Sequence, residues 1–176
     1  AAYWGVSIDE GEFLNGLGSS DNPEEGFVGN VYGAWGAIPP AGYGVHASPV
    51  ARLLRSYGLQ ADPDKGLSWN DLRAEIAAGR PVIVWVIGQM WSGTAIDYTS
   101  QDGTSTIVAR FEHTMILFGY DETHVQVIDA YSGWKLTYSL DNFLASWEVL
   151  GNMAVTGQGS GAGSGSSSAT DSQTGG

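Results

Sequence analysis

The residues best suited to chemistry are a histidine and an aspartate at the ends of a predicted β-hairpin. Residues 111–120 and 124–129 are rich in β-branched and bulky apolar side chains, and they flank a polar tip at Asp121-Glu122. A hairpin centred on Asp121 places His113 directly opposite Asp129, on one face, with their Cβ atoms about 4.5–5.5 Å apart. A one-residue slip would separate them onto opposite faces. Such a pair is a general base with its orienting carboxylate, two members of a nucleophilic triad.

The pair has a structural interpretation as well as a catalytic one. A histidine at a strand end is more often a core residue than a catalyst, whereas an aspartate after Val127-Ile128 would be costly to bury without a partner. The third member of a triad is missing from the sequence. The chain has no cysteine, and no serine lies in a Gly-x-Ser-x-Gly turn. Both interpretations therefore stay open at this point.

The other two histidines are weaker candidates. His124 lies near the hairpin tip and should be solvated, and His46 precedes a predicted helix, where it covers the helix end or lines a cleft. A metal site built from His113, His124 and Asp129 is opposed by the hairpin, because His124 would lie roughly 20 Å from His113 at ~3.3 Å per residue. We therefore predict no metal site and no cofactor.

Several aromatic residues fall in predicted loops. Trp35, Tyr43 and Trp91 could line a groove for an extended ligand, or they could pack beneath the long loops that carry them. Residues 18–44 form the longest of these loops, and we expect it to wall a cleft. Trp85, Trp134 and Trp147 are expected in strands and in the core.

The predicted elements indicate an α+β domain. Helices are expected at about 8–17, 49–57 and 69–78, with a short fourth helix capped by Ser139 at 140–144, and strands at 81–87, 111–120, 124–129, 134–138 and 147–155. The run 81–87 is apolar on both faces, which is typical of a central strand covered on both sides. Because helices precede strands, a helical layer packed on an antiparallel sheet is the predicted architecture.

Composition limits the class of protein. A net charge of −12 with seven Lys and Arg argues against nucleic acid and anionic membranes as partners, and no apolar run is long enough to span a bilayer. We predict one domain at 1–157 and a Gly/Ser-rich tail or linker at 158–176. The composition fits a secreted bacterial protein, placed outside the cell or on its surface. Residues 1–5 read as the last turn of a helix ending at Gly5, which indicates a fragment cut inside its first helix.

Three segments carry a resemblance to a known family. They are Gly79-Arg80-Pro81-Val82-Ile83-Val84-Trp85, the run from His113 through Gly119-Tyr120-Asp121, and Val125-Gln126-Val127-Ile128-Asp129. Together they resemble the bacteriocin-processing (double-glycine) peptidase-like branch of the papain-like cysteine peptidases, over residues 1 to about 155. The resemblance implies a papain-like fold with His113 as the base and Asp129 as its orienter.

The resemblance also implies what precedes the chain. In that family the catalytic cysteine begins the first long helix, where the helix dipole lowers the thiol pKa, and a glutamine shortly before it contributes to the oxyanion hole. Both would lie upstream of Ala1, so the chain as given should be inactive. We therefore expect a cysteine peptidase acting on a peptide or protein, once its upstream segment is present.

Two alternatives remain. The first is a catalytically inactive extracellular module that binds peptides or has a structural role, attached to the cell surface through its tail or through segments outside the sequence. The second is acyl transfer to an acceptor other than water.

Overall fold

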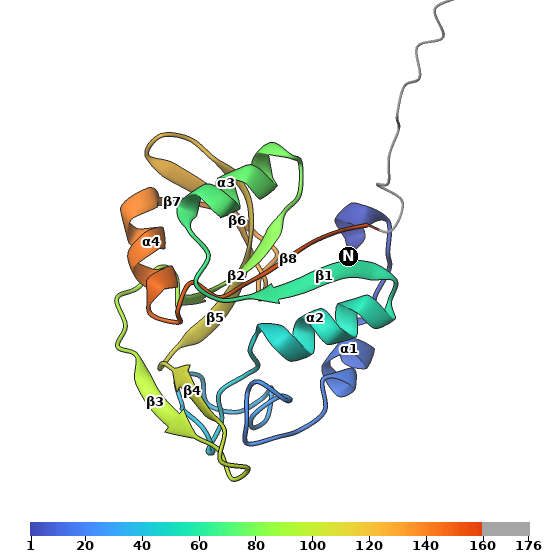
Figure 1. The fold of residues 1–176 in the computed structure, drawn as a ribbon, viewed down its shortest axis with the longest axis vertical. Helices are drawn as coiled ribbons and strands as arrows, with labels where there is room; N and C mark the ends of the chain where they lie inside the picture. The colour runs from blue at the N-terminus through green and yellow to red at the C-terminus, as the bar shows by residue number, and fades with distance from the viewer. Residues whose placement is uncertain (160–176) are drawn as a thin grey trace, which may run out of the picture.

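The computed structural model describes residues 1–159 as an α+β domain built on a six-stranded sheet (Figure 1). All neighbouring strands are antiparallel, in the order β1-β8-β2-β5-β6-β7. A separate two-stranded hairpin, β3–β4, extends from the main sheet. The strands are β1 Leu59–Asp64, β2 Val82–Ile87, β3 Ile96–Thr99, β4 Ser105–Val108, β5 Glu112–Tyr120, β6 His124–Asp129, β7 Lys135–Ser139 and β8 Ala154–Gly159.

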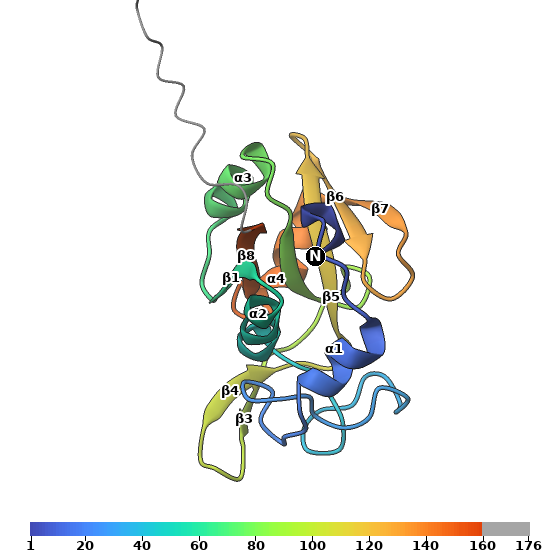
Figure 2. The same cartoon turned by 90° about the vertical axis from the view of Figure 1, so that its right-hand side faces the viewer.

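Helices lie on both faces of the sheet (Figures 1 and 2). Helix α2 packs on β1 and β8, whereas α3 and α4 pack on the opposite face, against β2 and β5. Two of these helices begin at serine caps: Ser68 forms a capping box with Asp71, and the Ser139 side chain accepts from the Asn142 amide. The helices are η1 Ala2–Trp4, α1 Glu10–Gly16, α2 Ala47–Ser56, α3 Trp69–Ala77 and α4 Leu140–Glu148.

Strand β2 divides the core into two clusters, as its sequence predicts. Trp85 and Ile87 point toward α2, and Val84 and Val86 point toward α4, where Phe143 and Trp147 are also buried. Because every side chain of β2 except Ile83 is fully buried, this strand fixes the position of its neighbour β5, which carries His113.

The predicted hairpin forms, but its register differs from the predicted one. Asp129 pairs with Met115 and not with His113, because the turn lies at Glu122-Thr123 and a bulge interrupts the ladder between Leu117 and Gly119. The shift is two residues, an even number, so His113 and Asp129 still point to the same face. They are diagonal neighbours, which long side chains can bridge.

Other predictions fail near the C-terminus. Trp147 is buried, but it belongs to α4, and Trp134 lies before β7 with most of its side chain exposed. The last strand is β8, which includes Gln158 and Gly159, paired with Gln60 and Leu59; the sequence analysis placed both in the tail. The rest of the predicted tail, 160–176, lies outside the described residues. Over residues 1–159, no helix has the length and apolar character needed to cross a bilayer.

The chain begins in a helical turn beside a face of the sheet that the helices cover only in part. Helix η1 ends at Gly5 in a left-handed conformation with φ of 75°, in agreement with the predicted glycine C-cap. It lies beside the face of the sheet opposite α3 and α4 (Figure 2). There Ile83, Ile116, Phe118 and Ile128 are only half-buried, because α2 covers β1 and β8 but not this part of the sheet. An apolar groove therefore crosses this face of the sheet beside η1, and it is lined from β1, β8, β2, β5 and β6.

Candidate active site

The site is a hydrogen-bonded His113–Asp129 pair at adjacent strand ends. His113 is in the second position of β5 and Asp129 is the last residue of β6. The His113 Nε2 and Asp129 Oδ1 atoms are 2.6 Å apart, and the Asp129 side chain is nearly buried while that of His113 remains partly exposed. The arrangement suits proton transfer, because the carboxylate holds one ring nitrogen and leaves Nδ1 as the nitrogen that can exchange a proton.

Asp129 is held in place by the turn that follows it. Its carboxylate accepts hydrogen bonds from the Tyr131 and Ser132 amides and from the Ser132 hydroxyl, the last at 2.6 Å. Burial by itself raises the pKa of Asp129, but the hydrogen bonds from Ser132 and His113 outweigh burial and lower the pKa overall. Asp129 is therefore an anion suited to orienting an imidazole. Ser132 was not among the predicted site residues, although an Asp-x-x-Ser pattern after a strand is a usual signal of such a turn.

Three exposed aromatic rings lie beside the pair. Trp35, Trp91 and Phe111 contact one another with ring centroids 5.4–5.6 Å apart, and Trp35 also lies edge-on to His113 at 6.1 Å. The Trp35 indole donates to the Glu112 carbonyl, which fixes the ring above the start of β5. The structure thus brings together Trp35 and Trp91, as the groove hypothesis requires, and adds Phe111, which was not among the predicted residues.

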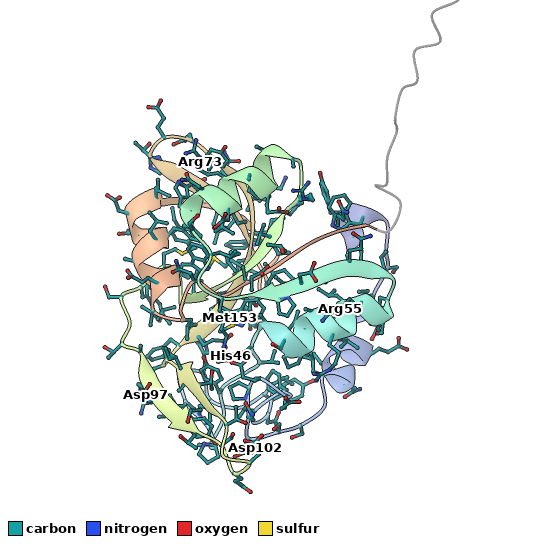
Figure 3. The ribbon with its side chains drawn as sticks, in the orientation of Figure 1. His46, Arg55, Arg73, Asp97, Asp102 and Met153 are labelled. Carbon is teal, nitrogen blue, oxygen red and sulfur yellow. The ribbon has the colours of Figure 1, made fainter. Side chains whose placement is uncertain are left out.

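Tyr43, the third aromatic candidate, belongs to a different cluster. Its hydroxyl is 3.0 Å from His46 Nε2, and the His46 Nδ1 atom is 2.6 Å from Glu24 Oε1. Burial raises the pKa of Tyr43 well above its usual value. His46 is fully buried at the start of α2, near Met153 (Figure 3). The network Glu24–His46–Tyr43 anchors the long loop, so His46 neither lines the site nor caps α2 with its side chain.

Two other titratable side chains of the hairpin differ in how far they are exposed to solvent. His124 is exposed at the far end of the hairpin, where it contacts Thr123 and Asp121. Glu112, next to His113 but on the opposite face of β5, is partly exposed as a residue but has its carboxyl buried near Trp85, and this burial raises its pKa to about 8 although the Trp85 indole favours the anion. Across residues 1–159, no three His, Asp or Glu side chains gather closely enough to hold a metal ion.

The six-stranded antiparallel sheet with helical layers is the papain-like fold. The sequence model of the Peptidase_C39-like family matches residues 1–155. The chain therefore belongs to the Peptidase_C39-like family.

Two individual relatives support this assignment. The crystal structure described as that of a putative C39-like peptidase from Bacillus anthracis superposes with a TM-score of 0.76 at 25% sequence identity, covering 89% of this chain and 82% of that one. The uncharacterised protein YvpB of Bacillus subtilis is 27% identical over 147 residues, which are 78% of this chain and 53% of YvpB. The chain thus spans about half the length of this curated relative.

Proposed function

We propose that this chain is the larger part of a cysteine peptidase domain that hydrolyses peptide bonds through a Cys–His113–Asp129 triad. The observation that carries the proposal is the 2.6 Å contact between His113 Nε2 and Asp129 Oδ1. Since the 176 residues contain no cysteine, the nucleophile is proposed to lie upstream of Ala1. Family membership supports this assignment.

The proposed reaction has two steps. In acylation, the cysteine thiolate attacks the peptide carbonyl carbon, and His113 gives a proton from Nδ1 to the leaving amine. In deacylation, His113 takes a proton from water, which hydrolyses the thioester and releases the carboxylic acid. Asp129 keeps the proton on Nε2 throughout, so that Nδ1 is the nitrogen facing the nucleophile.

The apolar groove beside η1 supports an upstream helix that packs on the sheet. Ile116 and Phe118 face the groove, and Ala1–Trp4 line it as well. A helix preceding Ala1 could lie along these side chains and bury them. His113 is three residues, or about 10 Å, from Ile116 along the strand, and its side chain points to the other face, so the cysteine would have to reach it at the end of the sheet where β5 begins. A cysteine at a helix N-terminus has a lowered thiol pKa, as the reaction requires.

The test is thiol-dependent hydrolysis by the longer chain that includes the upstream residues. We expect cleavage of unstructured polypeptides that iodoacetamide abolishes. His113→Ala should lower kcat by at least about 1,000-fold, because the base is lost. The matched control is His124→Ala, which removes an exposed histidine from the same hairpin and should leave the rate unchanged. Retained hydrolysis in His113→Ala would remove His113 from the mechanism.

A second candidate is a peptidase fold that binds peptides without cutting them. The observation in its favour is the lack of cysteine in the 176 residues. The upstream sequence distinguishes the two candidates directly. A cysteine within about a helix length before Ala1 supports the peptidase, and its absence supports the binding module.

A further inference from the structure

We propose that Trp35, Trp91 and Phe111, which we name the aromatic cluster, form a subsite for a large apolar side chain of the peptide substrate. This inference rests on the proposed function, because it assigns a substrate preference to the same site. The three side chains are 54%, 45% and 38% exposed, and they contact one another. Contiguous exposed apolar surface of this kind marks binding sites in soluble proteins.

The backbone is strained where it builds the cluster. Phe111 itself has a positive φ of 61°, a conformation unfavourable for a bulky residue. Gly36 and Gly88 also have positive φ, and a Cβ atom at either would lie 2.3 Å from the ring of Phe111 or Trp91 respectively. Strained backbone gathers at functional sites. Here one strained residue and two glycines that tolerate positive φ bring large rings together at the surface, where burial contributes little to folding.

The aromatic cluster lies directly beside His113, the proposed catalytic base. Trp35 contacts Phe111 and Trp91 on one side and the imidazole of His113 on the other. Phe111 is two residues before His113 in the chain. A side chain resting on the cluster would therefore belong to a residue close to the scissile bond.

The chemistry of the cluster favours an aliphatic or aromatic side chain. Its rings meet at interplanar angles of 44°, 73° and 81°, so they offer no single flat platform for stacking a sugar. The Arg110 guanidinium donates a hydrogen bond to the Gly36 carbonyl at 2.9 Å. Its positive charge beside the cluster disfavours a cationic substrate side chain. Burial of apolar surface is therefore what attracts a substrate side chain to the aromatic cluster.

The test measures binding separately from cleavage. The longer chain carrying His113→Ala and fluorotryptophan is titrated with capped Gly-Gly-X-Gly-Gly peptides, where X is Leu, Phe, Gly or Lys, and with a chito-oligosaccharide. We expect Leu and Phe to bind at least about fivefold more tightly than Gly. The fluorine resonances of Trp35 and Trp91 should shift, as assigned from Trp35→Phe and Trp91→Phe.

Substitutions within and outside the cluster complete the test. Trp91→Ala and Phe111→Asn should each abolish the preference for Leu over Gly. Asn tolerates the positive φ, so Phe111→Asn removes the ring without adding strain. Tyr32→Ala, which removes an exposed ring of the same loop that contacts no other aromatic ring in residues 1–159, should preserve the preference.

Several outcomes would overturn the subsite. They are equal affinity for X as Gly and Leu, tightest binding of Lys or the sugar, shifts confined to other tryptophans, or no binding at millimolar peptide. Failure of the proposed function looks different: no thiol-dependent hydrolysis by the chain with His113 intact, while the His113→Ala chain still prefers Leu and Phe.

Discussion

At the scale of single residues, His113 and Asp129 meet as diagonal neighbours on one face of the hairpin, with Nε2 and Oδ1 2.6 Å apart. Alternation along two strands is enough to place both side chains on one face. The register depends on a bulge near Phe118 and on a turn at Glu122-Thr123, which the sequence does not specify uniquely. The predicted direct pairing was wrong, but the register error was even, so the two side chains share one face and meet diagonally.

The surroundings of Glu112 and Phe111 depend on residues that are distant in the chain, so the sequence did not reveal them. Glu112 reads in the sequence as an ordinary charged residue at the start of a strand. Only the three-dimensional structure shows it packed near Trp85 and Gly44, where a Cβ on Gly44 would lie 2.6 Å from the Glu112 Oε2 atom. The same holds for Phe111, whose role depends on two tryptophans that are distant in sequence.

The buried carboxyl of Glu112 gives a prediction about alkaline stability. Its pKa is raised from 4.5 to about 8 in the folded state. The stability associated with its protonated form is fully present below about pH 4.5 and is lost as the pH rises through 8. We expect Glu112→Gln, which cannot ionise, to gain in melting temperature over the wild type between pH 5 and pH 8.5. A gain of at least ~1 kcal/mol corresponds to about 2–4 °C.

The control for this prediction is Glu122→Gln at the exposed hairpin tip. Its melting temperature should follow that of the wild type at both pH values. Parallel curves for Glu112→Gln and the wild type would show that Glu112 is solvated enough to ionise freely.

At the scale of elements, the helices and the central strand follow local rules, whereas the long loop does not. Ser68, Ser139 and the apolar run of β2 each lead to the element that the sequence predicts. The loop at 18–46 has no periodicity, and it is positioned by contacts that span the chain. Glu24 Oε1 accepts from His46, Lys65 and Thr106 at 2.5–2.7 Å. No local sequence pattern predicts such a network.

The Glu24 network gives a prediction about acid stability. Burial by itself raises the pKa of Glu24, but its bonds to His46, Lys65 and Thr106 outweigh burial and lower the pKa from 4.5 to about 2. Its contribution to stability is present above pH 4.5 and is lost as the pH falls through 2. We expect Glu24→Gln to cost about 2 kcal/mol at pH 7, measured by urea unfolding, and to lose less stability than the wild type on acidification.

Glu25→Gln is the matched control, since Glu25 is the adjacent residue and its side chain is exposed. It should unfold like the wild type across the pH range. An equal loss in Glu24→Gln and Glu25→Gln at pH 7 would mean that the network does not anchor the loop. Burial also lowers the pKa of His46. On acidification the unfolded state therefore binds this proton before the folded state does, and the folded state loses stability.

At the scale of the whole molecule, the two faces of the sheet differ in how completely they are covered. Phe143 and Trp147 are fully buried on the face beneath α3 and α4. On the other face α2 covers β1 and β8, and the side chains of β5 and β6 line the apolar groove beside η1. The sequence indicated a helical layer, but it could not show which part of the sheet that layer leaves uncovered.

This asymmetry gives a prediction that compares two lengths of chain. If the residues preceding Ala1 cover the groove, Phe118 is more deeply buried in the longer chain than in the chain of 176 residues. Phe118→Ala should then cost at least ~1 kcal/mol more in the longer chain, because more apolar surface is lost from its core. Phe143→Ala, on the face that is already covered, should cost the same in both chains. Urea unfolding of the four variants and two parents measures this difference, and equal costs for Phe118→Ala in both lengths would place the upstream residues elsewhere.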